Sequence, residues 1–269
     1  MDQIIQDKKV ALVTGGGTGM GRAVAMAFSR AMIRLAVIDK NEEGEKTAEM
    51  IRGSGGEAFF IRADVTNQDD ARHMVNKTIK TFGRLDYAFN NTNFFMESRS
   101  ISGKIRSVSW DFVVGMNLIG IWLCMKYEVT QMLKNKQGSI VNLGSFTSRT
   151  GFLNNMTYMQ AVNTWTKTAA LEYNAYGLRV NAVCADINCA EVIDPLITVE
   201  REKRIQTANS RLFGSMQTED QIARAVIWLS SDEAALVTGY PLVFDQSNFI
   251  RKKAQPDGEP DPVAVKHGQ

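Results

Sequence analysis

Short runs rich in apolar and β-branched residues alternate with longer amphipathic stretches along most of the chain. The short runs have the length and composition of strands buried on both faces of a parallel sheet. They cover residues 9–14, 34–39, 58–62, 85–90, 139–143, 179–184 and 241–244. The stretches between them repeat their apolar positions with a helical period, at about residues 20–31, 42–53, 67–82, 108–135, 156–176 and 218–230. The alternation predicts an α/β fold, a doubly wound parallel sheet of about seven strands with helices on both faces.

The pattern runs without a Gly/Ser-rich linker or internal repeat, so we expect residues 1–250 to form one domain. Three of the five prolines lie in the last stretch, where apolar content also falls. We expect residues 251–269 to form a disordered tail, because such a composition cannot bury enough apolar surface to fold.

Composition excludes several classes of protein. The 269 residues carry a net charge of +2 and are 44% apolar, as in an ordinary globular protein. The basic residues are scattered, so we expect no nucleic-acid partner. Neither a spanning apolar segment nor an apolar signal core is present, so we expect no membrane partner and a cytoplasmic location. Three cysteines without a C-x-x-C pair and two histidines predict no metal site.

A glycine-rich turn follows the first predicted strand and opens a helix. It reads Thr-Gly-Gly-Gly-Thr-Gly-Met-Gly-Arg and covers residues 14–22. Glycines allow the backbone to approach a diphosphate, whose charge is met by the helix N-terminus. The turn therefore predicts a Rossmann-like dinucleotide site. The alternative is a tight structural turn without a ligand.

An acidic residue, Asp39, ends the second predicted strand, 18 residues after Gly21. Its carboxylate is placed to accept hydrogen bonds from the adenosine ribose hydroxyls, and it would repel a 2′-phosphate. Met20, just before Gly21, supplies no basic group for that phosphate. We therefore expect NAD(H) in preference to NADP(H), against the alternative of an ordinary solvated carboxylate.

With these features the chain resembles the short-chain dehydrogenase/reductase family over residues 8–250. The family marker T-G-x-x-x-G-x-G corresponds to residues 14–21, and an Asp-Val pair where the adenine is held corresponds to Asp64 and Val65. The resemblance implies a catalytic set of Ser145, Tyr158 and Asn117, with Ser145 13 residues ahead of Tyr158. The implied cofactor-binding set is Gly15, Thr18, Gly19, Met20, Gly21, Asp39, Asp64, Val65 and Asn91.

One departure from the family pattern concerns proton transfer. The lysine expected four positions after the tyrosine is Val162. Residues i and i+4 share a helix face, so that lysine would lie beside both the phenol and the nicotinamide ribose. Without its charge the phenol of Tyr158 stays almost wholly protonated at neutral pH, which impairs it as a base. A neutral phenol can still donate a proton to a carbonyl oxygen, so residual activity should favour reduction.

Other cations do not obviously replace the lysine. Lys167 lies nine positions after Tyr158 and is predicted on the opposite helix face. The alternative is that a cation from another element, for example Lys126 or Arg149, takes the place of the lysine.

The other departures from the family pattern all fall on the nicotinamide side of the expected cleft. They are Asn90-Asn91-Thr92-Asn93, Ala185-Asp186, Ala190 and Asp245-Gln246-Ser247.

Two functions follow from this pattern. The first is an NAD(H)-dependent oxidoreductase acting on a carbonyl or alcohol of a small molecule, impaired or biased toward reduction, with Tyr158 as proton donor and Ser145 as oxyanion partner. The second is a dinucleotide-binding relative without hydride transfer, either a redox-neutral cyclase or isomerase or a non-catalytic binding protein. The resemblance also implies a homodimer or homotetramer formed through helices 108–135 and 156–176, whose apolar content could alternatively be buried within one subunit.

Overall fold

The computed structural model describes residues 8–91, 115–144, 153–185 and 219–244. Its centre is a sheet in the order β3-β2-β1-β4-β5-β6-β7, with every described pair of neighbouring strands parallel. The strands are β1 (Val10–Val13), β2 (Arg34–Asp39), β3 (Ala58–Arg62), β4 (Tyr87–Asn90), β5 (Gly138–Gly144), β6 (Leu178–Ala185) and β7 (Pro241–Phe244). The predicted fold class and strand positions are thereby confirmed.

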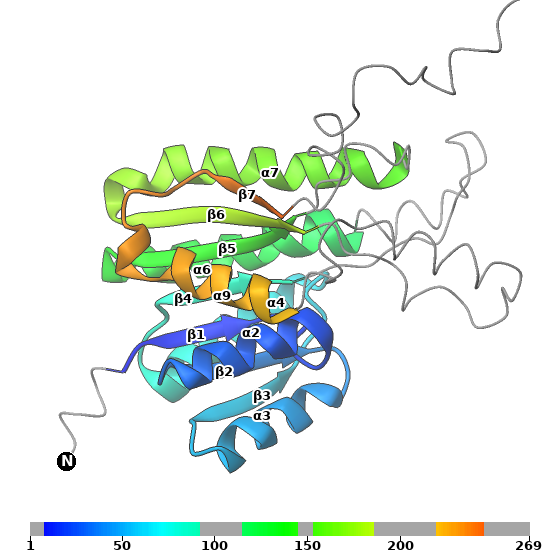
Figure 1. The fold of residues 1–269 in the computed structure, drawn as a ribbon, viewed down its shortest axis with the longest axis vertical. Helices are drawn as coiled ribbons and strands as arrows, with labels where there is room; N and C mark the ends of the chain where they lie inside the picture. Colours follow the sequence, from blue (N-terminus) through cyan, green and yellow to red (C-terminus); the bar gives the residue numbers. More distant parts are fainter. Residues whose placement is uncertain (1–7, 92–114, 145–152, 186–218, 245–269) are drawn as a thin grey trace, which may run out of the picture.

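Helices cover both faces of the sheet (Figure 1). On one face lie α2 (Gly19–Arg30), α3 (Glu43–Gly53) and α9 (Glu219–Ser230). On the other lie α4 (Gln68–Phe82), α6 (Gly120–Asn135) and α7 (Leu153–Tyr173). Successive strand residues point to opposite faces, so Leu12 joins the core under α4, α6 and α7, whereas Ala11 and Val13 join the core under α2, α3 and α9. Two apolar cores therefore hold the three layers together.

Two predicted helices differ in detail from the structure. Within the predicted helix 108–135, a π-helical turn, η2 (Gly115–Ile119), precedes α6, and residues 108–114 lie outside the described ranges. The predicted helix 156–176 begins at Leu153 and ends in a 3₁₀ turn, η3 (Asn174–Tyr176). Such turns depend on local hydrogen-bond geometry that apolar periodicity does not encode. The domain limit at residue 250 and the disordered tail remain predictions.

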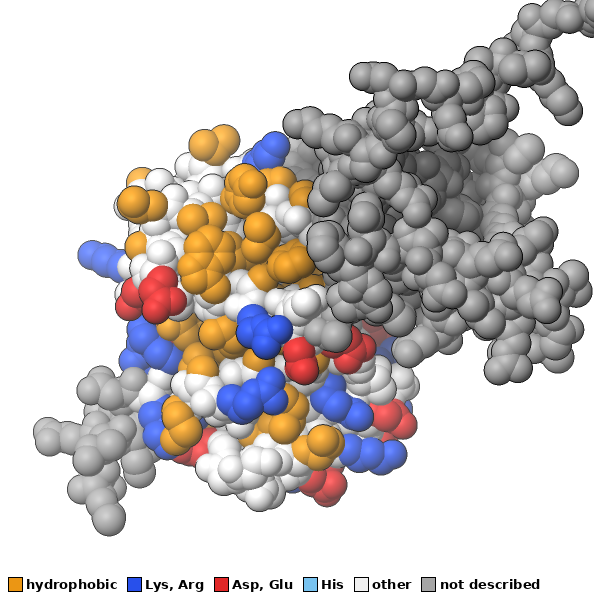
Figure 2. All heavy atoms as spheres, in the orientation of Figure 1, with side chains coloured by type: hydrophobic (Ala, Val, Ile, Leu, Met, Phe, Trp, Pro, Cys, Tyr) orange, Lys and Arg blue, Asp and Glu red, His pale blue; other side chains and the backbone are white. Residues whose placement is uncertain are grey.

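Several large apolar side chains on the helices remain exposed. Trp122 of α6 is 44% exposed and Leu171 of α7 is 86% exposed, so these helices are not fully buried within one chain. A second group of exposed apolar residues belongs to α9, β7 and the segment between them: Trp228, Leu236, Tyr240 and Val243. Figure 2 shows hydrophobic side chains gathered over the part of this face where β7 and α9 lie, and more charged side chains over α2 and α3.

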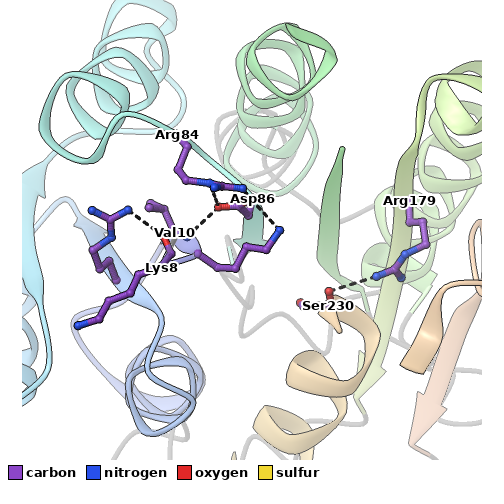
Figure 3. A network of polar contacts seen from close by, with 8 residues as sticks. Lys8, Val10, Arg84, Asp86, Arg179 and Ser230 are labelled. Atoms are coloured by element: carbon purple, nitrogen blue, oxygen red, sulfur yellow. Dashed lines mark hydrogen bonds and ion pairs between the residues drawn. The ribbon is translucent and has the colours of Figure 1, made fainter. Parts of the chain in front are cut away.

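A buried carboxylate joins the amino ends of β1 and β4 (Figure 3). Asp86 accepts a hydrogen bond from the backbone N–H of Val10 at 2.9 Å and two from the Arg84 guanidinium at 2.8 and 2.6 Å. Lys9 adds an ion pair at 3.4 Å. The side chain of Asp86 is only 3% exposed. These contacts connect the first and fourth strands at the end of the sheet opposite the glycine turn.

We expect Asp86→Ala to lower the free energy of unfolding by about 3 kcal/mol, because it removes the acceptor of the Val10 N–H and the buried carboxylate that Arg84 and Lys9 contact. Urea denaturation measures the change. Glu57→Ala removes the exposed ion pair with Lys8 and is the control, with an expected change below about 1 kcal/mol. Equal effects of the two substitutions would show that Asp86 does not organise this end of the sheet.

Candidate functional site

The predicted cofactor residues lie at the carboxyl end of the sheet, after β1, β2, β3 and β4. Strand β1 has β2 on one side and β4 on the other, so the sheet changes winding direction here, which is where doubly wound sheets bind ligands. The backbone N–H of Asn91 donates to Thr14 Oγ1 at 2.9 Å. The Asn91 side-chain amide donates to the carbonyl of Gly15 at 3.2 Å. The structure thus brings Asn91 against the glycine turn, as expected for one site.

Two glycines in the turn have no room for side chains. Gly15 has a φ of +57°, a left-handed conformation that L residues with a β-carbon rarely adopt. A β-carbon on Gly21 would overlap the carbonyl oxygen of Gly15 and lie 2.8 Å from the amide nitrogen of Asn91. The first turn of α2 is therefore packed directly on the backbone that leaves β1.

Helix α2 presents its N-terminus to this turn. Its N-cap is Thr18, whose side chain makes no capping hydrogen bond, and Gly19 and Met20 are its first residues. The first N–H groups of a helix have no partner within the helix and carry its positive dipole end. They suit an anionic group such as a diphosphate, so the residues present fit a dinucleotide.

Asp39 holds the same turn from the end of β2. Its Oδ2 accepts a hydrogen bond from the backbone N–H of Gly17 at 2.8 Å, and its Oδ1 accepts from Asn41 at 2.9 Å. On the other side of Gly17, the guanidinium of Arg22 donates to the Gly17 carbonyl and, at 3.0 Å, to Thr47 Oγ1. Arg22 and Thr47 were not predicted as site residues, although an arginine directly after the last glycine is visible in the sequence.

Asp64 and Val65 lie in different surroundings: Asp64 makes polar contacts at the site, and Val65 packs in the core. Asp64 accepts a hydrogen bond from Lys40 at 2.7 Å and two from Thr66. Burial alone raises the pKa of Asp64, but the hydrogen bonds from Lys40 and Thr66 and the charge of Lys40 outweigh it, so the pKa is lowered. Asp64 is therefore ionised at neutral pH, beside the strand that carries Asp39. Val65 is 8% exposed and packs in the core beneath α4 and α6.

The predicted catalytic residues are placed only in part. Ser145 would follow Gly144, the last residue of β5, and lies outside the described ranges. Tyr158 lies on α7 and Asn117 on η2, two elements that pack against each other, but their side chains are not among those described. The π-helical turn at Asn117 is a feature often found at functional sites. The catalytic set therefore remains a prediction.

Val162, the residue in place of the lysine, lies in the apolar core. It is 2% exposed and belongs to the same core cluster as Ile121 and Ile140. Lys167 is exposed, as predicted for the opposite face of α7. The ammonium of Lys126 lies over the rings of Trp122 and Tyr127, at 5.1 and 5.5 Å from their centroids. Lys126 is thus engaged on the surface of α6, and Arg149 lies outside the described part of the chain.

Of the other departures, Asn90 and Asn91 end β4 and begin the following turn, while Thr92, Asn93, Asp186, Ala190 and residues 245–247 lie outside the described ranges. Cys184 is buried, and its thiol donates to Asn163 Oδ1 at 3.3 Å. Burial raises the pKa of the Cys184 thiol to about 11, so it is protonated at neutral pH.

A buried polar network that the sequence did not predict lies between the sheet and α6. The side-chain amide of Asn90 donates to Glu128 Oε2 and to Asn142 Oδ1, each at 3.0 Å. Asn142 in turn donates to Thr166 Oγ1 at 3.0 Å. Glu128 is completely buried. Its signal in the sequence was an acid four positions after Cys124 on an otherwise apolar helix face.

None of the described helices is long and apolar enough to span a membrane. In the same described ranges, no cluster of three His, Cys, Asp or Glu side chains is arranged to hold a metal ion.

We expect Gly21→Ala to lower the free energy of unfolding by about 1–3 kcal/mol, because the added methyl group forces the Gly15 carbonyl and α2 apart. Chemical denaturation measures this loss. The matched control is Gly53→Ala at the end of α3, where a β-carbon meets no atom within 4 Å and stability should rise by up to about 1 kcal/mol. If Gly21→Ala left the free energy of unfolding unchanged, the close packing of the turn against α2 would be contradicted.

Comparison with known proteins agrees with this arrangement. Residues 15–246 match the family model described as enoyl-(acyl carrier protein) reductase. The chain is 35% identical to the short chain dehydrogenase/reductase astE of Aspergillus oryzae, over 88% of this chain and 93% of that protein. It is 35% identical to an uncharacterized oxidoreductase of Thermotoga maritima, over 86% and 93% of the two chains. It is 32% identical to a cyclohexanol dehydrogenase of an Acinetobacter species, over 91% and 98%. The chain belongs to the short-chain dehydrogenase/reductase family, whose members are oxidoreductases that use nicotinamide cofactors.

Proposed function

We propose that this chain is an NAD(H)-dependent oxidoreductase that acts on a carbonyl or alcohol of a small molecule and is impaired or biased toward reduction. The observation that carries the proposal is the glycine turn, held between Asp39 and Asn91 with the N-terminus of α2 open toward it. When bound, the nicotinamide would supply the hydride. The chain's own residues would bind the dinucleotide and deliver the proton.

The charges around Asp39 support NAD(H) as the cofactor. Its carboxylate lies at the end of β2, where the adenosine ribose is held in this type of fold. The neighbouring cations are already engaged: Lys40 pairs with Asp64 at 2.7 Å, and Arg22 donates to the Gly17 carbonyl. A 2′-phosphate would therefore meet a carboxylate before it met an uncommitted cation. A 2′-hydroxyl could instead donate to that carboxylate.

Proton delivery would rest on Tyr158 as donor and Ser145 as oxyanion partner. The water-mediated relay in which Asn117 takes part in the family pattern usually runs through the lysine, so Val162 would break it. Val162 would limit the ability of Tyr158 to act as a base, because an aliphatic side chain in the core supplies no charge to stabilise a phenolate. A neutral phenol suffices for reduction, in which the proton moves from the tyrosine hydroxyl to the carbonyl oxygen. Oxidation of an alcohol needs the phenolate and would suffer more.

The burial of Val162 also favours a second candidate function. A dinucleotide-binding protein without hydride transfer, either a redox-neutral cyclase or isomerase or a non-catalytic binding protein, would keep the adenosine side of the site and lose the lysine. Both functions share the nucleotide-binding turn, so binding alone does not separate them. NADH-linked turnover separates them, because only the first function transfers a hydride.

We further propose that the chain forms a homodimer or homotetramer. The exposed apolar side chains of Trp122 on α6 and Leu171 on α7 support an interface on these helices, because covering apolar surface with a second chain is favourable. The exposed group on α9 and β7 offers a second surface of the same kind (Figure 2).

We expect Asp39→Asn to improve NADP⁺ binding by on the order of 10-fold or more while changing NAD⁺ binding much less, because it removes the repelling charge. The single amide oxygen can still accept the hydrogen bond from Gly17, so the turn keeps this contact, whereas the exposed N–H of Asn41 loses its acceptor. Isothermal titration of both dinucleotides against both proteins measures the two dissociation constants. A wild-type protein that binds NADP⁺ as tightly as NAD⁺ would refute the assignment of NAD(H).

We expect Val162→Lys to raise the rate of NADH-linked reduction of a generic diketone or ketosteroid panel by on the order of 10²-fold, the usual scale of acid–base assistance. Val162→Met, of similar length and without charge, is the control for packing changes and should leave the rate near wild type. NADH oxidation followed by absorbance measures the rate, and NAD⁺ titration confirms that each variant binds.

The same assay separates the two candidate functions. Turnover in the wild type that rises in the lysine variant supports an impaired reductase. Tight NAD⁺ binding without turnover in either protein overturns the oxidoreductase proposal in favour of the second function.

A further inference from the structure

The network around Glu128 leaves two buried acceptors without partners. Among the described residues, Glu128 Oε1 and Asn90 Oδ1 have no hydrogen-bond partner, although both side chains are completely buried. Buried polar atoms are nearly always hydrogen-bonded, because water is lost to them on folding. A protonated carboxyl group suits this setting better than a carboxylate, because its O–H is a donor whereas a carboxylate can only accept.

No cation compensates a charge on Glu128 within the described structure. The sheet offers Asn90 from β4 and Asn142 from β5, and α7 offers Thr166, all of them neutral. The buried residues of α4, which packs against α6, are Ala71, Met74, Val75 and Thr78. Cys124, one turn earlier on α6, is the titratable group that interacts with Glu128, and burial together with Glu128 raises the pKa of its thiol.

The ionisation of Glu128 is shifted accordingly. Burial raises the pKa of this carboxyl from 4.5 to about 7, and the hydrogen bond from Asn90 opposes the shift only in part. A pKa that is higher in the folded than in the unfolded chain favours folding fully below the unfolded value, and this contribution is lost as pH rises through the folded value. Glu128 therefore changes its charge near neutral pH, inside the core.

The network reaches the glycine turn through adjacent residues. Asn90 ends β4 and contacts Glu128, whereas the next residue, Asn91, holds Thr14 and Gly15. A displacement of Asn90 would therefore act through one peptide bond on Asn91, which bonds to Thr14 and Gly15. The alternation of a strand places these neighbours on opposite sides, one toward α6 and the other toward the turn.

We propose that Glu128 is a proton-dependent positioning residue for the nucleotide site: as a neutral acid it holds the end of β4 against the glycine turn, and its ionisation loosens that contact and weakens dinucleotide binding. A buried carboxylate without a counter-ion draws in water or displaces its neighbours, and Asn90 is the neighbour bonded to it. The binding part of this inference rests on the proposed function, whereas the coupling from Glu128 to the turn does not.

The test compares the full-length wild type with Glu128→Gln, which keeps the shape and cannot ionise. We expect the dissociation constant of NAD⁺ for the wild type to rise roughly fivefold or more between about pH 6 and about pH 8, the lower end of usual coupling strengths. Glu128→Gln should bind at both pH values as the wild type does at the lower one. Glu49→Gln, on an exposed part of α3, is the matched control and should keep the wild-type pH dependence.

A second set of measurements needs no ligand. In the wild type, the backbone amide NMR signals of Gly15 and Asn91 should titrate with an apparent pKa of about 7, and in Glu128→Gln this titration should be lost. The unfolding equilibrium constant of the wild type should also rise by on the order of 10²-fold between about pH 5 and about pH 8 relative to Glu128→Gln.

The outcomes separate this inference from the proposed function. NAD⁺ binding that is independent of pH, or a pH dependence that persists in Glu128→Gln, overturns the inference and leaves the proposed function intact. A wild type that binds no NAD⁺ at either pH overturns the proposed function. In that case the amide signals decide: their titration in the wild type alone supports the coupling, and flat signals overturn it.

Discussion

The nucleotide end of this protein depends on the contact of two glycines across the first turn. Helix α2 can begin directly over β1 only because Gly21 has no side chain beneath the carbonyl of Gly15. That contact fixes the direction of the helix N-terminus and leaves the Gly15 carbonyl free to accept from Asn91. It also places the N–H of Gly17 within reach of Asp39. Three strands, β1, β2 and β4, are thereby joined at one point, which is why a short turn can organise the whole crevice.

Residue 162 lies in the apolar core although the family pattern has a charged residue there. Val162 is on α7, four positions after the predicted tyrosine, where that pattern has a lysine. The substitution suits packing, because a buried aliphatic side chain needs no counter-ion or hydrogen bond. In the proposed function, dinucleotide binding rests on the glycine turn and α2 and proton transfer rests on α7, so the two would be separable.

The buried polar network around Glu128 connects β4, which leads to Asn91, with α7, which carries Val162. Asn90, Asn142 and Thr166 form a chain of hydrogen bonds from β4 through β5 to α7, with Glu128 attached from α6. Thr166 lies one turn after Val162 on the same helix. A core of this kind is sensitive to a single proton, because an unpaired charge costs far more there than at the surface. The ends of the strands that carry the site rest on this network.

The sequence by itself determined the architecture and the glycine turn. The strand predicted at residues 58–62 is β3, and the glycine turn opens a helix after β1, because strand and helix periods and the glycine motif are local properties of the chain. The ribose contact of Asp39 stays a prediction. Only the tertiary structure decided that Val162 lies in the core, that Arg22 meets Thr47, and that Glu128 meets Asn90 across 38 residues. The π-helical turn at Asn117 belongs with these. Burial and hydrogen-bond partners depend on which faces pack together, and that is a property of the assembled layers that no single segment contains.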